Sequence, residues 1–273
     1  MTEQIQLNRA EPLIAIGNIY GEDAARLADF AYEFDFKGIE WSVAPYTSDI
    51  DLLKQVDLLH DFEVRFHLRW PGIEFAYADS RSKAAMDLYR CKFEIIAILG
   101  GEYVTIHLGL GRIDCKELDW GKAIENLTAL VATGSELGIK VCLENLITNW
   151  TSKPELYKQI VKQTGACVTL DIGHAHVCYM KQKEKNIYKK FSQPNQGRIL
   201  GAHIYHTEIP GMGHIAPQNI VQIKERLSLL DSLPNCKWWL IELTRPDEIL
   251  RTRRICQQFL AVSAKSSQPV AVN

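Results

Sequence analysis

The stretch YVTIHLGLGRIDCKELDWGKAIENLTALVATGSELGIKVCLENL, residues 103–146, contains the pattern that decides the fold. It begins and ends with a short apolar run, Tyr103–Leu108 and Lys140–Leu146, of the kind that forms buried strands. Between the two runs, apolar residues recur at helical spacing and give one apolar face, at Trp120, Ile124, Leu127 and Val131. Because a strand, a helix and a second strand follow one another, the stretch predicts two parallel strands with a crossover helix.

The same alternation extends over almost all of the 273 residues. Together with the two runs above, six further runs make eight predicted strands: Leu13–Ile16, Gly38–Val43, Val64–Leu68, Cys167–Ile172, Leu200–Tyr205 and Trp238–Leu243. Eight parallel strands close into a barrel. The sequence therefore predicts an α/β fold, a single (β/α)8 barrel, with residues 1–273 as one domain.

Two segments test this prediction. An open, doubly wound sheet would also alternate, but the first strand is followed by Ile16-Gly17-Asn18-Ile19-Tyr20-Gly21, which is not the GxGxxG of nucleotide-binding folds. The polar segment Lys181–Arg198 ends in Gln-Pro-Asn-Gln-Gly and is predicted to be an exposed excursion from the barrel.

Composition narrows the classes of function. Lys and Arg total 31 against 33 Asp and Glu, so no basic excess favours nucleic acid as a partner. The N-terminal residues MTEQIQLNRAEP lack the features of a secretory signal, and no run is long enough to span a bilayer, so no membrane partner is expected and a cytoplasmic location is predicted. Seven scattered cysteines without a CxxC pair argue against a disulfide framework or a thiolate zinc site.

Histidines and acids gather at the ends of predicted strands three to eight, which the barrel brings to one mouth. They are His67, His107, Glu144, Asp171, His174, His203 and Glu242. A carboxylate in an apolar strand is costly to bury unless it is compensated, and few basic residues are near in sequence, notably Arg65, Arg69 and Arg245. A shared divalent cation is the favoured explanation, while buried histidines and structural ion pairs remain the alternative. Carboxylate and imidazole ligands together favour one Mn²⁺ or Co²⁺ ion, and Mg²⁺ or Zn²⁺ also fit.

Several of these segments resemble the xylose isomerase-like TIM-barrel superfamily, which includes sugar isomerases and epimerases, inosose and dehydroshikimate dehydratases, and endonuclease IV. The similarity covers nearly the whole chain and includes GIEWS (38–42), LGGEYVTIHLG (99–109), WGKAIENLTALVATGSELGIKVCLEN (120–145), LDIGHA (170–175), AHIYH (202–206) and PGMGH (210–214). The resemblance implies that the metal ligands are Glu144, Asp171, His203 and Glu242, with Glu144 and Glu242 also catalytic, on opposite sides of the substrate. Expected substrate contacts are His67, His107, His174, Trp70 and His206, although packing is an equal alternative for Trp70 and solvent exposure for His206.

Three positions depart from the family pattern. His206, followed by Glu208, takes the place of an Asp three residues after the strand-seven histidine. The stretch TEIPGMGH (207–214) has no arginine of the kind that ketose 3-epimerases use to hold substrate. It also offers only His214 where endonuclease IV has an Asp-Arg-His triplet. These departures weaken both an ordinary ketose epimerase and a DNA-repair enzyme.

The sequence therefore predicts a metal-dependent isomerase or epimerase that moves a proton on a sugar, a sugar phosphate or a related hydroxy-carbonyl compound. A dehydratase of the inosose or dehydroshikimate type is the first alternative. An endonuclease IV-like metallonuclease is the second, because His67 and His107 stand where that enzyme completes a multinuclear zinc site with Glu144. A barrel that binds ligand without turnover is a third. The expected partner is a small carbohydrate-like molecule, and related barrels often pair through outer helices, so a homo-oligomer is also expected.

Overall fold

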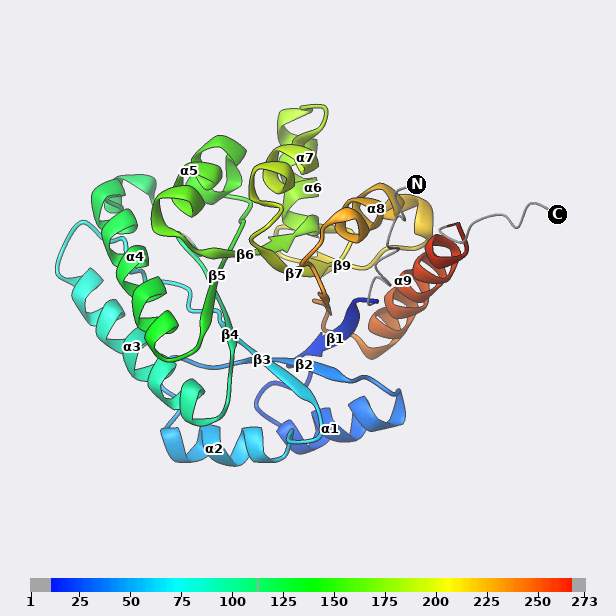
Figure 1. Ribbon diagram of the computed structural model, residues 1–273, viewed down its shortest axis with the longest axis horizontal. Coiled ribbons are helices and arrows are strands. Elements are labelled where there is room, and N and C mark those ends of the chain that lie inside the picture. The colour runs from blue at the N-terminus through cyan, green and yellow to red at the C-terminus, as the bar shows by residue number, and fades with distance from the viewer. Residues whose placement is uncertain (1–10, 112, 267–273) are drawn as a thin grey trace, which may run out of the picture.

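The computed structural model describes residues 11–111 and 113–266, and in it eight parallel strands close into a barrel with helices around it (Figure 1). Around the barrel the order is β1-β10-β7-β6-β5-β4-β3-β2, with every neighbouring pair parallel. The strands are β1 (Leu13–Gly17), β2 (Gly38–Ser42), β3 (Glu63–Leu68), β4 (Tyr103–Ile106), β5 (Lys140–Glu144), β6 (Cys167–Asp171), β7 (Ile199–Ile204) and β10 (Trp238–Ile241). The predicted barrel is confirmed.

Helices separate the strands and cover the outside of the barrel. They are α1 (Ala24–Glu33), α2 (Asp49–Asp57), α3 (Arg81–Ile98), α4 (Trp120–Glu136), α5 (Pro154–Thr164), α6 (Ile172–Gln182), α7 (Ile187–Ser192), α8 (Lys224–Ser232) and α9 (Pro246–Ser266), with single 3-10 turns at Cys115–Glu117, Trp150–Ser152, Gln193–Asn195 and Ile220–Gln222. Helix α5 shows how the sequence sets an element. Pro154 occupies its first turn, where no backbone N–H is needed, and Gly165 ends it in a left-handed conformation with φ of 75°.

The segment Lys181–Arg198 is not the exposed excursion that its polarity predicted. It contains the end of α6 and the whole of α7, and two apolar side chains of α7, Ile187 and Phe191, are fully buried. The Phe191 ring lies 5.8 Å from the ring of Tyr157 on α5. Polar residues dominate the composition of this segment because they form the solvent-exposed side of its helices. Two apolar residues four positions apart are enough to pack one short helix against the protein.

Polar side chains form layers inside the barrel below the mouth. Thr105 and Thr169, each on the inner face of its strand, are joined by a 2.8 Å contact between their hydroxyl oxygens. Nearer the start of the strands, the Arg65 guanidinium stacks on the rings of Tyr103 and Trp238 at 3.8 and 4.5 Å. Since successive inward residues are two apart, these layers lie directly beneath the side chains of the mouth.

A small antiparallel hairpin follows β7 and reaches over the same mouth. It consists of β8 (Thr207–Ile209) and β9 (Gly213–Ile215), and Glu208 and His214 are directly paired in its register. The seven cysteines are free thiols, as expected. In residues 11–111 and 113–266, none of the helices combines the length and the hydropathy that crossing a bilayer requires.

Candidate metal centre

Three metal ligands implied by the resemblance lie at the carboxyl ends of neighbouring strands. Glu144 and Asp171 are the last residues of β5 and β6, and His203 on β7 is the register partner of Asp171. Glu242 follows β10 directly, and its backbone N–H donates to the carbonyl of Ile204. Parallel strands in a closed barrel therefore bring four separate segments of the chain to one point.

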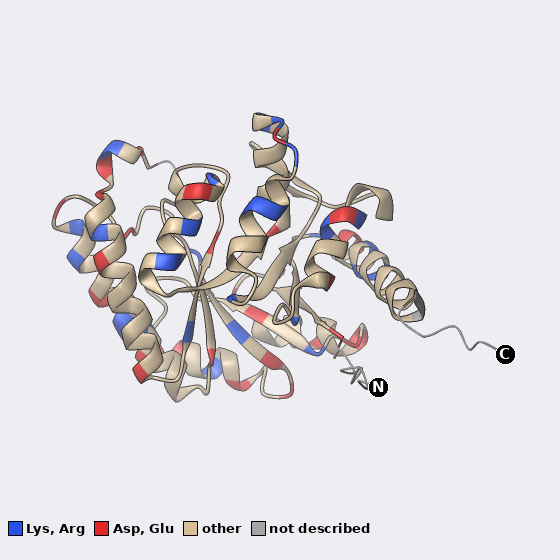
Figure 2. Ribbon diagram, turned by 45° about the horizontal axis from the view of Figure 1, so that its top comes forward, with Lys and Arg blue, Asp and Glu red and all other residues tan. Residues whose placement is uncertain are grey.

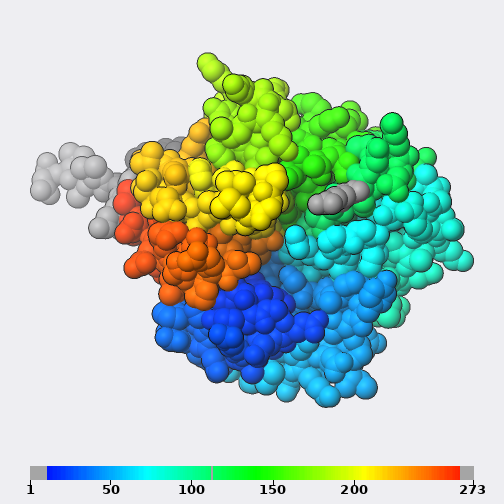
Figure 3. All heavy atoms as spheres, turned by 180° about the vertical axis from the view of Figure 1, so that it is seen from behind, coloured from blue at the N-terminus to red at the C-terminus, as the bar shows by residue number. Residues whose placement is uncertain are grey.

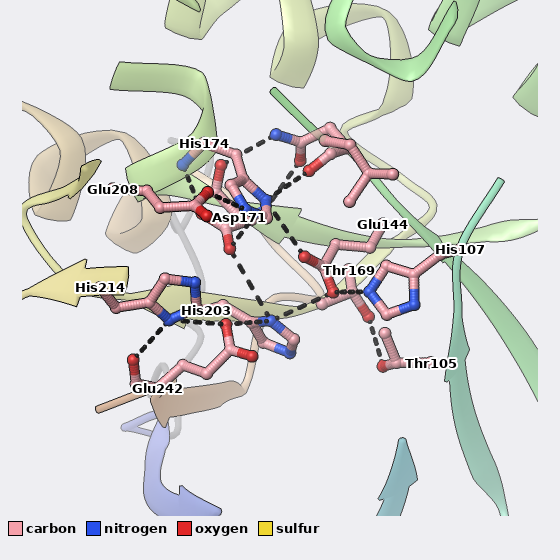
Figure 4. A network of polar contacts seen from close by, with 12 residues as sticks. Thr105, His107, Glu144, Thr169, Asp171, His174, His203, Glu208, His214 and Glu242 are labelled. Carbon is pink, nitrogen blue, oxygen red and sulfur yellow. Dashed lines mark hydrogen bonds and ion pairs between the residues drawn. The ribbon is translucent and has the colours of Figure 1, made fainter. Parts of the chain in front are cut away.

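These four side chains converge on a common position (Figure 4). One ligand atom from each lies within 4.8 Å of the others. The Nδ1 atom of His203 is 3.3 Å from Glu144 Oε2 and 3.1 Å from Glu242 Oε2. Both His203 Nδ1 and Glu242 Oε2 are buried without a well-formed hydrogen bond to any described residue. Because buried polar atoms are rarely left without a partner, this pair fits a cation shared among the four ligands.

A second group adjoins the first through Glu144. The Nε2 atoms of His67 and His107 lie 3.2 Å apart, and they are 3.5 and 3.0 Å from Glu144 Oε2. Burial, reinforced by the neighbouring His107, lowers the pKa of His67 to about 4. The imidazole is therefore neutral at physiological pH, which is the form that binds metals. The structure thus brings His67 and His107 to the centre, as the sequence predicted.

A third group lies on the hairpin side of the centre. His174 Nε2 is 3.2 Å from Glu208 Oε2, and His214, the register partner of Glu208, completes the group. The His214 ring stacks on Tyr205 with the centroids 3.9 Å apart, and its Nδ1 is 2.9 Å from the carbonyl oxygen of Glu242. From sequence, Glu208 and His214 were noted only as departures from a family pattern. Their pairing across a PGMG turn is the signal that could have found them, since a tight turn brings flanking residues together.

Glu40 on β2 is a further member that the sequence analysis missed. Its side chain is buried, and Oε1 lies 2.9 Å from His203 Nε2 and 3.3 Å from His67 Nδ1. The other oxygen accepts a 2.9 Å hydrogen bond from the indole of Trp238. A carboxylate behind a histidine ligand fixes the ring orientation and leaves the opposite nitrogen for a metal. The signal was a single acid within the apolar strand GIEWS, which costs free energy to bury unless it has such partners.

Asp171 is held in place by several hydrogen bonds. One oxygen caps helix α6 by accepting the backbone N–H of His174 at 2.6 Å, and the other accepts the hydroxyl of Tyr205 at 3.0 Å. Asn145 bonds both the backbone N–H and the carbonyl of Asp171 at 2.9 Å. Burial raises the pKa of Asp171 to about 6, against the opposing effect of His174. A bound cation would favour the charged form.

Histidines, and not arginines, are the partners of these carboxylates. Glu144 is fully buried, which opposes ionisation, yet His203 and His107 hold its pKa well below the usual range. In the described part of the chain, no Lys or Arg lies within 4.0 Å of the carboxylates of this cluster. Arg245 pairs with Asp247 instead. The alternative in which basic residues neutralise the acids therefore has no support from the geometry.

Two expected substrate contacts lie apart from the cluster. Trp70 is buried, donates its indole N–H to the carbonyl of Val43 at 2.7 Å and packs on Tyr89 with the centroids 4.6 Å apart. His206 faces away and lies 3.0 Å from Arg226. Neither residue borders the cavities described below.

Two cavities open over the centre. One of about 200 Å³ is bordered by His107, Glu144 and His174, and one of about 520 Å³ lies over Glu40 and His67. Four residues border both cavities: Arg69, Glu208, His214 and Glu242. Figure 3 views the molecule from the back, where the yellow segment around the hairpin lies beside the green middle part, with the orange C-terminal part between it and the blue N-terminal part. The cluster is thus accessible to a small ligand.

Comparisons with known proteins agree with this architecture. The family model for the xylose isomerase-like TIM barrel matches residues 28–251. The chain belongs to this family. An uncharacterized protein of Methanocaldococcus jannaschii is 32% identical to this chain over 163 residues, which are 60% of this chain and 69% of that protein.

Solved structures share the xylose isomerase-like fold at low identity. D-allulose 3-epimerase from Methylomonas superposes with a TM-score of 0.71 at 17% identity, over 92% of this chain and 99% of that chain. Endonuclease IV from Thermus thermophilus superposes with a TM-score of 0.65 at 15% identity, over 92% and 100%. At such identities the likeness establishes the fold, while the reaction has to be argued from the site.

Proposed function

We propose that the protein is a divalent metal-dependent isomerase or epimerase that acts on a sugar, a sugar phosphate or a related hydroxy-carbonyl compound. One observation carries the proposal: Glu144 and Glu242, two of four converging ligands, both border the cavity of about 200 Å³. A carboxylate that faces substrate can remove and return a proton as well as bind a cation. Epimerases and isomerases of the same family make this reaction class the first to test.

The residues present fit a cation of the Mn²⁺, Co²⁺ or Zn²⁺ type, held by Glu144, Asp171, His203 and Glu242. When bound, such an ion polarises a substrate carbonyl and stabilises an enediolate. Glu242, which borders the cavity, takes the proton from the carbon next to the carbonyl. Glu144 delivers a proton to the same carbon, the proton comes from His174, whose Nδ1 is 3.2 Å from Glu144 Oε1 in the same cavity, and the proton on Glu242 is released to solvent.

Deuterium uptake tests this proposal. Metal-loaded protein is incubated with ketoses in D₂O, and exchange at the carbon next to the carbonyl is followed by NMR. Glu144→Gln and Glu242→Gln should each slow the exchange by about 10² to 10⁴, which is the usual contribution of a general acid or base. Glu22→Gln, at the rim of the larger cavity, is the matched control. Unchanged exchange in both site variants would contradict the proposal, and formation of a conjugated alkene that absorbs in the ultraviolet would favour the dehydratase.

A second candidate, phosphodiester cleavage of the endonuclease IV kind, is favoured by one specific observation. Two further groups, at His67, His107 and Glu144 and at His174, Glu208 and His214, adjoin the central one. Three adjacent groups suit a multinuclear site, in which the ions stabilise both the attacking and the leaving oxygen. Against it stand the formal charge of −2 and the interspersed basic and acidic residues on the outer helices (Figure 2). Elemental analysis separates the candidates, since two or three zinc ions per chain favour the nuclease and one ion favours the isomerase.

A further inference from the structure

Arg69 is a basic side chain in a mouth lined by acids. Of the residues that border the two cavities, it is the only Lys or Arg, and the acids there are Glu22, Glu40, Glu144, Glu208 and Glu242. Within residues 11–111 and 113–266, no ion pair within 4.0 Å and no hydrogen bond occupies its guanidinium, although the other mouth arginine, Arg245, is paired with Asp247. An unpaired guanidinium among carboxylates is available to a ligand.

The position of Arg69 is defined by its neighbours in the chain. It follows the end of β3 and precedes Trp70, whose indole is bonded to Val43 and packed on Tyr89. The backbone on both sides is therefore fixed by buried contacts, while the Arg69 side chain is exposed. Because Arg69 borders both cavities, a ligand that extends from the smaller cavity into the larger one passes beside it.

We propose that Arg69 binds the phosphate of a phosphorylated ketose, so that the substrate is a sugar phosphate and not a free sugar. This inference rests on the proposed isomerase function and specifies its substrate. A guanidinium matches a phosphomonoester with two parallel hydrogen bonds, whereas a neutral hydroxyl gains much less from it. Because Arg69 is the one Lys or Arg among the residues that border the two cavities, it offers a phosphate a permanently charged partner with two parallel donors, which no imidazole there can match.

Paired ligands test the assignment. Binding of D-ribulose 5-phosphate and of D-ribulose to the metal-loaded protein is measured by calorimetry for wild type, Arg69→Met and Arg69→Lys. Wild type should bind D-ribulose 5-phosphate about tenfold more tightly than D-ribulose, or better. Arg69→Met should abolish this preference and change the affinity for D-ribulose by less than about twofold. Arg69→Lys should keep part of the preference, because it keeps the charge but not the paired donors. Arg245→Met, which removes an exposed arginine that borders neither cavity, should leave the preference unchanged.

Equal affinities for the two ketoses in wild type, or a preference that survives Arg69→Met, would overturn the proposal. If neither ketose binds, inorganic phosphate is the probe, and equal binding or no binding in wild type and Arg69→Met overturns the assignment as well. Deuterium exchange on the same samples separates this inference from the isomerase function. If Arg69→Met loses the preference for the phosphate ester but wild type shows no deuterium exchange, the phosphate contact of Arg69 is supported and the isomerase function is rejected.

Discussion

Glu74 offers a pH-dependent test of the loop that supports the metal centre. It lies between β3 and α3, is buried, and accepts backbone N–H groups from Ala76 at 3.0 Å and from Gly109. Gly109 follows His107 by two residues, so this carboxylate ties two loops of the mouth together. Burial raises the pKa of Glu74 from 4.5 to about 7, although these N–H groups favour the charged form.

The sign of the effect follows from proton linkage. Between about pH 4.5 and pH 7 the folded protein keeps a proton on Glu74 that the unfolded chain has lost, so stability falls as pH rises through this window and levels off above it. A change from 4.5 to about 7 corresponds to about 3 kcal/mol in total, of which about 2 to 3 kcal/mol falls between pH 5 and pH 8. We therefore expect Glu74→Gln to gain about that much stability relative to wild type over this interval.

Urea unfolding at several pH values measures the effect, with chelator present so that metal binding does not contribute. Only the difference between variant and wild type is used, because buried histidines such as His67 titrate in both proteins and cancel. Glu94→Gln, at an exposed carboxylate on α3, is the control and should differ from wild type by a constant amount. If the difference in unfolding free energy between Glu74→Gln and wild type were also constant with pH, the reasoning would be refuted, because the pKa of Glu74 would then be the same in the folded and the unfolded chain.

Three further results are expected. Gly173→Ala places a Cβ atom 2.1 Å from the ring of Tyr205, whose hydroxyl donates to Asp171. We expect the free energy of unfolding, measured in urea, to fall by about 1 to 3 kcal/mol, and metal binding, measured by calorimetry, to weaken. A metal affinity equal to that of wild type would contradict this. Phe191→Ala should cost about 3 to 5 kcal/mol in urea unfolding, because the ring is fully buried against Tyr157, and a loss below about 1 kcal/mol would mean that α7 is not docked. Addition of Zn²⁺ or Mn²⁺ at about 100 times its dissociation constant should stabilise the chelator-treated protein by about 2.7 kcal/mol, and an unchanged melting temperature would argue against a metal centre.

The strands could be predicted from sequence because each is a short apolar run followed by a helix. Their ends could not be placed to the residue, and the ends matter here. His107 and Glu242 were expected within strands but lie one residue beyond β4 and β10. The convergence of the four ligands did not depend on these boundaries, since barrel closure brings every strand end to the same mouth.

What the sequence could not supply was contact between distant segments. Glu40 is 163 positions from His203, and nothing in its local pattern indicates that they lie 2.9 Å apart. The directions of loop side chains were equally out of reach, because Trp70 turns toward Val43 and His206 toward Arg226 through packing that involves other loops. The ligand roles, the single-domain organisation, the cytoplasmic location and the homo-oligomer remain predictions.

The β8–β9 hairpin has a consequence for how the protein could diversify. Glu208 and His214 stand opposite each other only in the present register, around a turn that includes Gly211 and Gly213, both at positive φ. Inserting or deleting one residue in that turn would send the two side chains to opposite faces of the ribbon, while the strands that hold Glu144 and Asp171 would stay as they are. A single short indel at this tip could therefore remove the group of His174, Glu208 and His214 and leave the group of Glu144, Asp171, His203 and Glu242 intact, without rebuilding the barrel.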